Sequence, residues 1–562
     1  MRSILTTLRP YWPYLLLWFG LNILQSLTTE LLHDEAYYWV YANHLDWGYF
    51  DHPPAVAVLI RAGLWLPGEL GVRLTTVLVS TGVLAFLFAW IKPRRPGLFF
   101  LFVASMMLFH IGGFVAVPDI PLLALTCGFL YLFQRYLRED SLGTALLLAL
   151  ICALLMYSKY HAAILLVFAI VPNLGALMRR RTFWLIPLVA LVLFAPHLWW
   201  QWQHDFVTFR FHLFERGSRG FRWDYPLNYV LGQLLVYGPL MGFLVLASIR
   251  HWQIRDRFAR TLAWVVMGVF GLFLLMSLRG RIEANWTALA FPALVWLSYP
   301  VIEGQDRLLR WLKILAIPSV VLIVIVRILF AVEVVTDSKF RETHGWKAWA
   351  ASIQDAADGS TAIFRNSYQQ AAKYMFYSGE PSFSMNGPNY RGNQFDLLPD
   401  LEVVLQGAPV TVFTSSFHDS LAVRFGDALD TGIETYHRQR FDAFNSFNQL
   451  EIRLVQVPET VRMGTTSSWR LEVLNPLDLP VVVPDQDVTR IMLWMRHTGE
   501  RSESWQDLGP PGFERLEPGA SHQREVQVVA PDPPGTYAFR LGVMWNLTGG
   551  KNTFLHHIEV VR

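Results

Sequence analysis

The chain has 562 residues, of which 53% are hydrophobic and 16% charged, with a formal net charge of +3. An average soluble protein carries about a quarter charged residues, and so small a net charge gives no reason to expect a nucleic-acid partner. The charge deficit lies almost wholly before residue 333, so we expect a polytopic α-helical membrane protein with a water-exposed tail.

About eleven stretches are long and apolar enough to cross a bilayer, which takes about 20 mostly apolar residues. These expected spans are 10–29, 72–91, 97–118, 119–134, 141–158, 160–178, 182–203, 225–249, 261–278, 284–302 and 314–332, the last of which contains Arg327. The shorter run 53–68 contains Arg61 and is expected to form an interfacial helix. The first run lacks a small-residue cleavage site and therefore predicts a retained helix.

Charge in the connecting loops predicts the orientation. The connections 92–95, 135–140, 179–181, 250–260 and 306–313 are all basic, whereas acids and histidines gather in the alternate set. Because basic loops stay on the cytoplasmic side, we expect a cytoplasmic N-terminus and, after an odd number of spans, a tail on the outer side. Cys127 and Cys152 lie inside apolar runs, which is typical of packed thiols and not of a disulfide framework.

The tail has two patterns. Residues 336–455 mix a helical pattern with short strand-like runs, which predicts a small α/β lobe after a transmembrane domain at 1–335. Residues 456–562 alternate polar and apolar positions between Pro, Gly, Asp and Asn turns. That pattern favours an immunoglobulin-like β-sandwich.

Ionisable residues at the ends of membrane spans are costly and are therefore functional candidates. Those expected on the outer side are Asp34, Glu35, Asp51, His52, Asp119, Lys159, His161, His204, Asp205, Arg222, Arg279, Arg281 and Glu283. Cations hold a phosphate and a carboxylate can deprotonate a hydroxyl, so the set suits chemistry on a lipid-linked phosphate. Each residue also has a structural interpretation: the acids can cap helices, and Lys159 can reach from an apolar surface to water.

Five motifs in order strengthen the functional interpretation. They are "HDEAYYWVYANHLDWGYFDHPPAVAVLI" (33–60), "VPDIPLL" (117–123), "YSKYHAAILL" (157–166), "PHLWWQWQHDFVTFRFH" (196–212) and "GRIEANWTALAFPAL" (280–294). Together with "NSYQQAAKYMFY" (366–377) and "RGNQFDL" (391–397), they resemble the bacterial family-39-like glycosyltransferases. That family has the GT-C fold and is related to protein O-mannosyltransferases and lipid A aminoarabinose transferases. The resemblance covers roughly residues 30–400.

The resemblance implies transfer of a sugar, with inversion, from a polyprenyl (undecaprenyl) phosphate donor to a hydroxyl on the periplasmic face of a bacterial inner membrane. The acceptor would be a glycolipid, a glycan or a protein. The family pattern places the catalytic carboxylate at Asp34, with Glu35 beside it, and a second acid at Asp119. Relatives often carry a Glu-Lys pair before the diproline, where this chain has Asp51-His52. Phosphate binding then falls to Lys159 and the arginines Arg222, Arg279 and Arg281.

The remaining candidates for substrate binding are Tyr37, Asp51, His52, His204, Glu283, Asn285, Gln369 and Arg391. No cofactor is required, and a divalent metal held by residues such as Asp51 and His204 is chemically allowed but is the less favoured hypothesis. Two other classes stay open: a transporter or flippase of lipid-linked sugars, and a membrane-anchored glycan-binding protein. Charges at loop ends and the absence of visible internal repeats favour the enzyme over a transporter.

Overall fold

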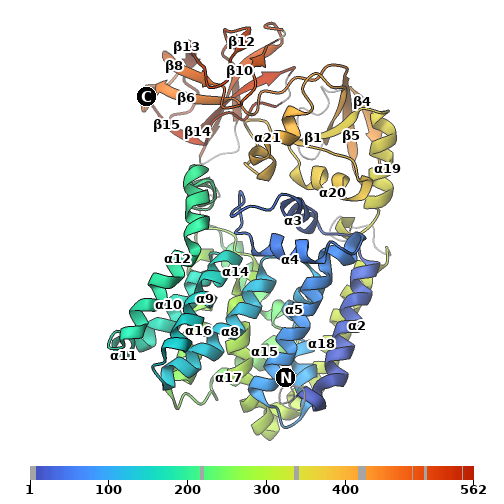
Figure 1. Cartoon of the computed structure of the whole chain (residues 1–562), viewed down its shortest axis with the longest axis vertical. Helices are drawn as coiled ribbons and strands as arrows, with labels where there is room; N and C mark the ends of the chain where they lie inside the picture. Colours follow the sequence, from blue (N-terminus) through green and yellow to red (C-terminus); the bar gives the residue numbers. More distant parts are fainter. Residues whose placement is uncertain are drawn as a thin grey trace. The chain divides into compact units, whose positions relative to one another are not determined.

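The computed structural model describes residues 8–215, 221–333, 341–415, 426–483, 485–498, 503–546 and 549–562. The chain divides into two compact units, Met1–His344 and Gly345–Arg562. The first unit is built from helices and the second carries the strands (Figure 1). The division follows the change in composition, because the apolar runs end shortly before the boundary.

Within the described part of the first unit, six helices are long and apolar enough to span a membrane. They are α5 (Gly68–Ile91), α8 (Asp119–Arg138), α12 (Arg181–Gln203), α16 (Arg257–Ser277), η4 with α17 (Ala284–Ala290 and Phe291–Gly304) and α18 (Asp306–Ala331). Two shorter apolar stretches, α9 (Leu142–Ser158) and α10 to α11 (Ala162–Leu177), coincide with two further expected spans. The first unit is that of a multi-pass membrane protein.

Three expected spans are parts of sharply bent helix pairs. The bends are 91° between α2 (Trp12–Thr28) and α3 (His33–Asn43), 82° between α6 (Pro96–Ala104) and α7 (Met107–Phe114), and 100° between α14 (Asp224–Val236) and α15 (Met241–Ile249). Gly238 in the last break has a positive φ of 115°, which a glycine adopts without a Cβ clash, and Pro239 follows it. The spans expected at 97–118 and 225–249 are thus each broken by a bend, and each helix pair is long and apolar enough to be one span.

Between α2 and α5 the chain forms α3 and α4 (Ala55–Gly63), of which α3 packs on α4 and α4 packs on α5 (Figure 1). Helix α4 buries Val56, Ala57 and Ile60 and exposes Val58 and Arg61, the one-sided pattern expected for an interfacial helix. In the core beneath, Trp18 donates from Nε1 to Ser80 Oγ at 2.9 Å, which joins α2 to α5.

The second unit opens with an α/β lobe. Its sheet has the order β2-β1-β3-β5-β4, formed by β1 (Thr361–Arg365), β2 (Ser384–Met385), β3 (Val410–Ser415), β4 (Asp427–Asp430) and β5 (Thr435–Phe441). Strand β1 is parallel to both β2 and β3, and β5 is antiparallel to β3 and β4. Helices α19 (Trp346–Ala357) and α20 (Tyr368–Ser378) cover one face, where Trp349 and Tyr374 pack on Phe364. Two short helices, η6 (Gln394–Leu397) and α21 (Pro399–Val403), lie between β2 and β3.

The last part of the chain is rich in strands. One sheet has the order β11-β10-β14-β15-β7, from β11 (Glu503–Asp507), β10 (Thr489–His497), β14 (Gly535–Trp545), β15 (His556–Val561) and β7 (Thr460–Arg462). The other has the order β13-β8-β6, from β13 (Ser521–Val529), β8 (Thr466–Leu474) and β6 (Glu451–Gln456), and β9 (Val481–Val482) pairs with β12 (Arg515–Leu516). Trp469 of β8 contacts Phe539 of β14 at 5.2 Å between ring centroids, so the two main sheets pack face to face.

Candidate active site

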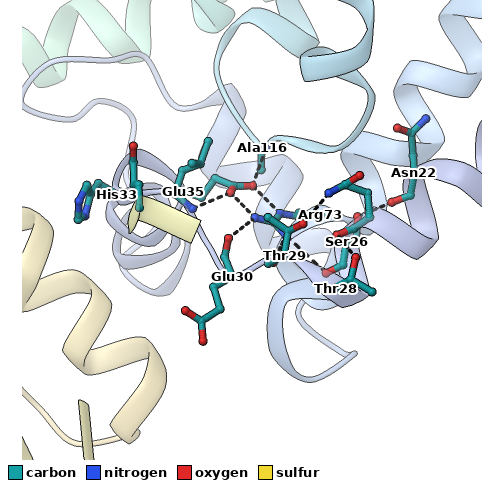
Figure 2. A network of polar contacts seen from close by, with 12 residues as sticks. Asn22, Ser26, Thr28, Thr29, Glu30, His33, Glu35, Arg73 and Ala116 are labelled. Atoms are coloured by element: carbon teal, nitrogen blue, oxygen red, sulfur yellow. Dashed lines mark hydrogen bonds and ion pairs between the residues drawn. The ribbon is translucent and has the colours of Figure 1, made fainter. Parts of the chain in front are cut away.

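The first acidic pair of the sequence occupies the first turn of α3, and its two members differ sharply. Asp34 is exposed, whereas Glu35 is fully buried. The Glu35 carboxylate accepts from Arg73 Nε at 2.8 Å and from Arg73 Nη2 at 2.6 Å, a two-pronged ion pair between α3 and α5 (Figure 2). Arg73 is also fully buried and donates to the carbonyl oxygens of Thr29 and Glu30. Breaking such a pair from one side is strongly destabilising, so Glu35 and Arg73 anchor the start of α3.

The same carboxylate reaches a third segment. Glu35 Oε1 accepts from the backbone N–H of Ala116 at 2.9 Å (Figure 2). Glu35 Oε2 also accepts from Leu32 N at 3.0 Å. Ala116 lies three residues before Asp119, the first residue of α8. The Glu35–Arg73 pair therefore fixes the chain on both sides of the candidate site: the turn that carries Asp34 and the turn that carries Asp119.

The second predicted acid is paired with a predicted cation. Lys159 Nζ lies 2.9 Å from Asp119 Oδ1 and 3.0 Å from Oδ2, and both side chains are largely buried. Asn285 Nδ2 donates to Asp119 Oδ2 at 2.9 Å, and Asn285 is itself exposed. Three residues from α8, the C-cap of α9 and η4 thus form one polar cluster that reaches solvent through Asn285.

The Asp51-His52 pair lies next to this cluster. Tyr41 of α3 donates its hydroxyl to Asp51 Oδ1 at 2.6 Å. Burial of the imidazole lowers the pKa of His52 to about 4; Lys159 and His212 act in the same direction, and the charges of Asp51 and Asp119 oppose them. At neutral pH His52 is therefore an uncharged imidazole, with one ring nitrogen as donor and the other as acceptor.

The three candidate arginines are placed differently from Lys159. Arg222 pairs with Asp224 at 2.9 Å and Arg281 with Glu283 at 3.0 Å, each two residues away and at an exposed position. Arg279 is exposed after the end of α16. Their expected role in holding a phosphate gains no support from the described contacts, which join only Asp119 and, through it, Asn285 to Lys159.

Two further candidates are packed instead of open to a substrate. Tyr37 is 1% exposed and meets the Tyr41 ring edge-on at 4.7 Å between centroids. His204 follows α12, stacks on Trp200 at 4.1 Å and contacts the Trp200 carbonyl oxygen through Nδ1 at 2.9 Å. Tyr37 is thus buried among aromatic side chains, whereas His204 is half-buried and its Nδ1 is engaged by the backbone. Gln369 and Arg391 belong to the second unit and are described with it below.

A bound metal has no assembled ligand set in the part of the chain that the structure describes, where no three His, Cys, Asp or Glu side chains are grouped to hold an ion. Asp51 keeps a hydrogen bond from Tyr41, and His204 is stacked on Trp200. The hypothesis of a metal at Asp51 and His204 therefore finds no such group around it, and we derive no step through a metal.

Several residues of this region were not predicted. Arg73 lies at the start of an expected span, and only the fold shows that it meets Glu35. His212, in η3 (Phe211–Glu215), contacts the Asp51 carbonyl oxygen through Nε2 at 2.9 Å, and its place in the motif 196–212 was the available signal. Tyr41 lies two turns after Asp34 on α3, and its spacing from Asp51 gave no hint of the contact.

Arg327, a charged residue within a membrane helix, also has polar partners. Its Nε donates to Gln25 Oε1 and its Nη1 to Asn22 Oδ1, both at 3.0 Å, and Nη1 lies 3.2 Å from His110 Nδ1. Because His110 Nε2 contacts the Ala104 carbonyl oxygen at 2.6 Å, Nε2 carries the proton and Nδ1 accepts from Arg327. Arg327 thus joins α18 to α2 and α7, and this network is structural.

Residues 51–200 match the model of the family described as dolichyl-phosphate-mannose-protein mannosyltransferase, a range that includes His52, Asp119 and Lys159. A lipid A galacturonosyltransferase, RgtD of Rhizobium johnstonii, is 28% identical over 292 residues, which are 48% of this chain and 61% of that protein. The chain thus matches less than two thirds of the curated relative's length.

Crystal structures of ArnT from Cupriavidus metallidurans superpose on most of the chain. The apo structure gives a TM-score of 0.54 at 15% identity, covering 75% of this chain and 97% of ArnT. The structure bound to undecaprenyl phosphate gives 0.56 at 14% identity, covering 76% and 97%. The chain has the GT-C fold. The expected PMT/ArnT-like resemblance is confirmed.

Proposed function

We propose that the chain is an inverting glycosyltransferase that moves a sugar from a polyprenyl phosphate to a hydroxyl of a lipid A-type glycolipid. The observation that carries the proposal is the arrangement around Glu35. One buried ion pair fixes the exposed carboxylate of Asp34 and the turn before Asp119, whose own carboxylate holds Lys159. The donor class is supported by the ArnT structure described as bound to undecaprenyl phosphate, and the acceptor class by the name of RgtD.

Asp34 is the general base in this proposal. Asp34 lies at an exposed position on a firmly anchored helix, which suits a carboxylate that receives a proton from an acceptor hydroxyl. The acceptor oxygen transfers its proton to Asp34 as that oxygen bonds to the anomeric carbon. The bond from the anomeric carbon to the phosphate oxygen breaks, its electron pair leaves with the polyprenyl phosphate, and the configuration inverts. A positioned base of this kind contributes about 10²–10⁴-fold.

Lys159 supplies the charge for the leaving phosphate. An ammonium group has three donors, and two oxygens of Asp119 lie within hydrogen-bond distance of Nζ, so a phosphate oxygen can take a remaining donor. Asp119 and Asn285 keep the ammonium in place before the donor arrives. Stabilisation of a developing charge by groups that are already oriented is often the largest contribution to catalysis.

His52 complements Lys159 as a neutral donor. This chain has a histidine where relatives often carry a lysine, and the low pKa of His52 keeps its imidazole uncharged at neutral pH. The ring can donate one hydrogen bond to a phosphate oxygen without adding a second positive charge beside Lys159. We infer that a single cation, Lys159, and the neutral imidazole of His52 together bind the phosphate.

The orientation follows the loop charges: the N-terminus is cytoplasmic, and α3, α4 and the Asp119–Lys159 cluster face the periplasmic side of a bacterial inner membrane. The support is that the basic connections and the candidate site lie at opposite ends of the spans. Asp119 begins α8 whereas Arg135 and Arg138 end it, and basic loops stay in the cytoplasm.

The test is transfer by the purified full-length protein in lipid nanodiscs. Undecaprenyl phosphate carrying galacturonate, aminoarabinose or mannose is incubated in turn with lipid A, and the products are identified by mass spectrometry. We expect one of these donors to add the mass of one sugar to lipid A, with no nucleotide sugar needed. Transfer to a glycan or a peptide instead would correct the acceptor. No transfer from any lipid-linked donor to any of these acceptors would overturn the proposal.

A further inference from the structure

Two loops of the α/β lobe lie at the ends of adjacent parallel strands. The loop 366–369 leaves the carboxyl end of β1 and enters α20, and the loop 386–393 leaves the carboxyl end of β2. The chain passes from β1 to β2 on one side and then to β3 on the other side of β1. In such sheets ligands bind outside the carboxyl ends of the strands, where the strand order changes direction.

Direct contacts join the two loops. Asn366 follows β1 with a positive φ of 54° and accepts from Gly387 N through Oδ1 at 2.8 Å. Arg391 lies over the Tyr368 ring, with its guanidinium carbon 4.8 Å from the ring centroid. A Cβ on Gly387 would lie 3.1 Å from Asn389 Oδ1 and 3.5 Å from Asn366 Oδ1. The loops are therefore one surface, assembled around a glycine with little room for a side chain.

Three side chains on these loops have polar atoms that are shielded from solvent without a hydrogen bond in the described structure: Gln369 Oε1, Asn389 Oδ1 and Asn393 Nδ2. Asn393 is 0% exposed, and its other side-chain atom is used, since Oδ1 accepts from Phe395 N at 3.0 Å. A buried polar atom without a partner is unfavourable. Three such atoms on two touching loops offer hydrogen-bonding groups to a polar ligand.

The charge of the loops favours an anion. Residues 366–369 and 386–393 contain one arginine and no acid. Arg365, the last residue of β1, is buried directly before the first loop. The N-terminus of α20, an 11-residue helix, adds the positive end of its dipole. The nearby Asp396 is already paired with Lys551, so it offers little repulsion.

We propose that the loops 366–369 and 386–393 bind an anionic saccharide, a pyranose that carries a carboxylate or a phosphate. A guanidinium fits either group with two parallel hydrogen bonds, the amides of Gln369, Asn389 and Asn393 pair with sugar hydroxyls, and the Tyr368 ring offers a flat face. The proposal that this saccharide binds depends only on residues of the α/β lobe. That the saccharide is part of the acceptor rests on the proposed function.

The test measures binding to the full-length protein in nanodiscs by saturation-transfer NMR. The probes are galacturonate, glucosamine 1-phosphate and the neutral sugar N-acetylglucosamine. The variants are Arg391→Ala and the isosteric Gln369→Glu, which adds a negative charge without changing the fold of α20. Arg496→Ala is the matched control, because Arg496 is an exposed arginine that also lies over an aromatic ring, Trp494, in the same unit.

We expect an anionic probe to bind wild type and Arg496→Ala with equal affinity. Its affinity for Arg391→Ala and for Gln369→Glu should fall at least about tenfold. Preference for galacturonate or for glucosamine 1-phosphate identifies the carboxylate or the phosphate as the recognised group. Equal binding to all four proteins, equal binding of the neutral sugar, or no binding of either anion would overturn the proposal. Asp34→Asn should bind the probes as wild type does but should not transfer sugar. Loss of sugar transfer is therefore distinguishable from loss of saccharide binding by the lobe.

Discussion

Replacing Arg73 with methionine tests the ion pair that anchors α3. The substitution keeps an unbranched side chain in α5 but removes both donors to Glu35, at 2.8 and 2.6 Å, and those to two backbone carbonyl oxygens. Both side chains are fully buried, so the carboxylate would stay in the interior without its cation. Removal of one partner of a buried pair costs about 3–5 kcal/mol.

The assay is thermal unfolding of detergent-solubilised protein, followed by tryptophan fluorescence, on Arg73→Met, Glu35→Gln and the double variant. We expect Arg73→Met to be the least stable, and the double variant to recover about 2 kcal/mol or more, because neither charge is then left alone. The backbone N–H of Ala116 keeps an acceptor in the glutamine variants. Equal destabilisation of Arg73→Met and the double variant, or a cost below about 1 kcal/mol for Arg73→Met, would refute the anchoring argument.

Three further predictions follow from the site. Lys159→Met should weaken binding of undecaprenyl phosphate about tenfold or more, as measured by microscale thermophoresis. Arg222→Met breaks only an exposed ion pair and should change this affinity less than about twofold. A larger loss for Arg222→Met than for Lys159→Met would place the phosphate site at Arg222. The pKa of His52 falls from its usual value near 6.5 to about 4 in the folded protein. Between pH 6.5 and pH 4, therefore, the histidine is protonated in the unfolded chain but not in the folded protein. The contribution of neutral His52 to the free energy of unfolding is present above pH 6.5 and is lost as the pH falls toward 4. His52→Gln should therefore lose less thermal stability than wild type between pH 7 and pH 5, and equal losses would contradict the burial of that ring. Asn285→Ala should reduce transfer while leaving the unfolding midpoint within about a degree, since Asn285 is exposed; a large loss of stability would make Asn285 a structural residue instead.

Charge-free apolar runs located the membrane helices well because charged residues end such runs. The expected span at 182–203 differs by one residue from α12 (Arg181–Gln203). Bends were missed where apolar composition continues through them. The dipeptide Gly238-Pro239 was a readable break between α14 and α15, but the break at Ser105-Met106 between α6 and α7 leaves no comparable mark, since only tertiary packing requires it.

Part of the site was predictable because the charges of the loops indicate which loops lie on the same side of the membrane. Asp119 and Lys159 were expected on the outer side and Asn285 was expected to bind substrate, and the structure joins all three directly. Their pairing spans many residues of chain and depends on how α8, α9 and η4 pack, which no local pattern encodes. Arg222 and Arg281 were expected there for the same reason, yet each has an acid two residues away that engages its charge. That local spacing was visible in the sequence.

The buried charges were the least predictable part. Glu35 looked like a second catalytic acid because it stands beside Asp34, and sequence cannot say which of two neighbouring side chains on a helix faces inward without knowing the helix's neighbours. The structure turns Glu35 toward Arg73 and leaves Asp34 exposed. The polar residues Asn22 and Gln25 inside the first apolar run were the available sign that a buried polar partner, Arg327, faces them.

The most direct measurement of the central claim is single-turnover transfer by Asp34→Asn in nanodiscs, with donor binding measured on the same preparation. The matched control is Glu139→Gln, an exposed acid at the opposite end of α8 from Asp119. We predict that Asp34→Asn binds undecaprenyl phosphate as wild type does but transfers about 10²–10⁴-fold more slowly, while Glu139→Gln is unchanged. Near-normal transfer by Asp34→Asn would show that Asp34 is not the base.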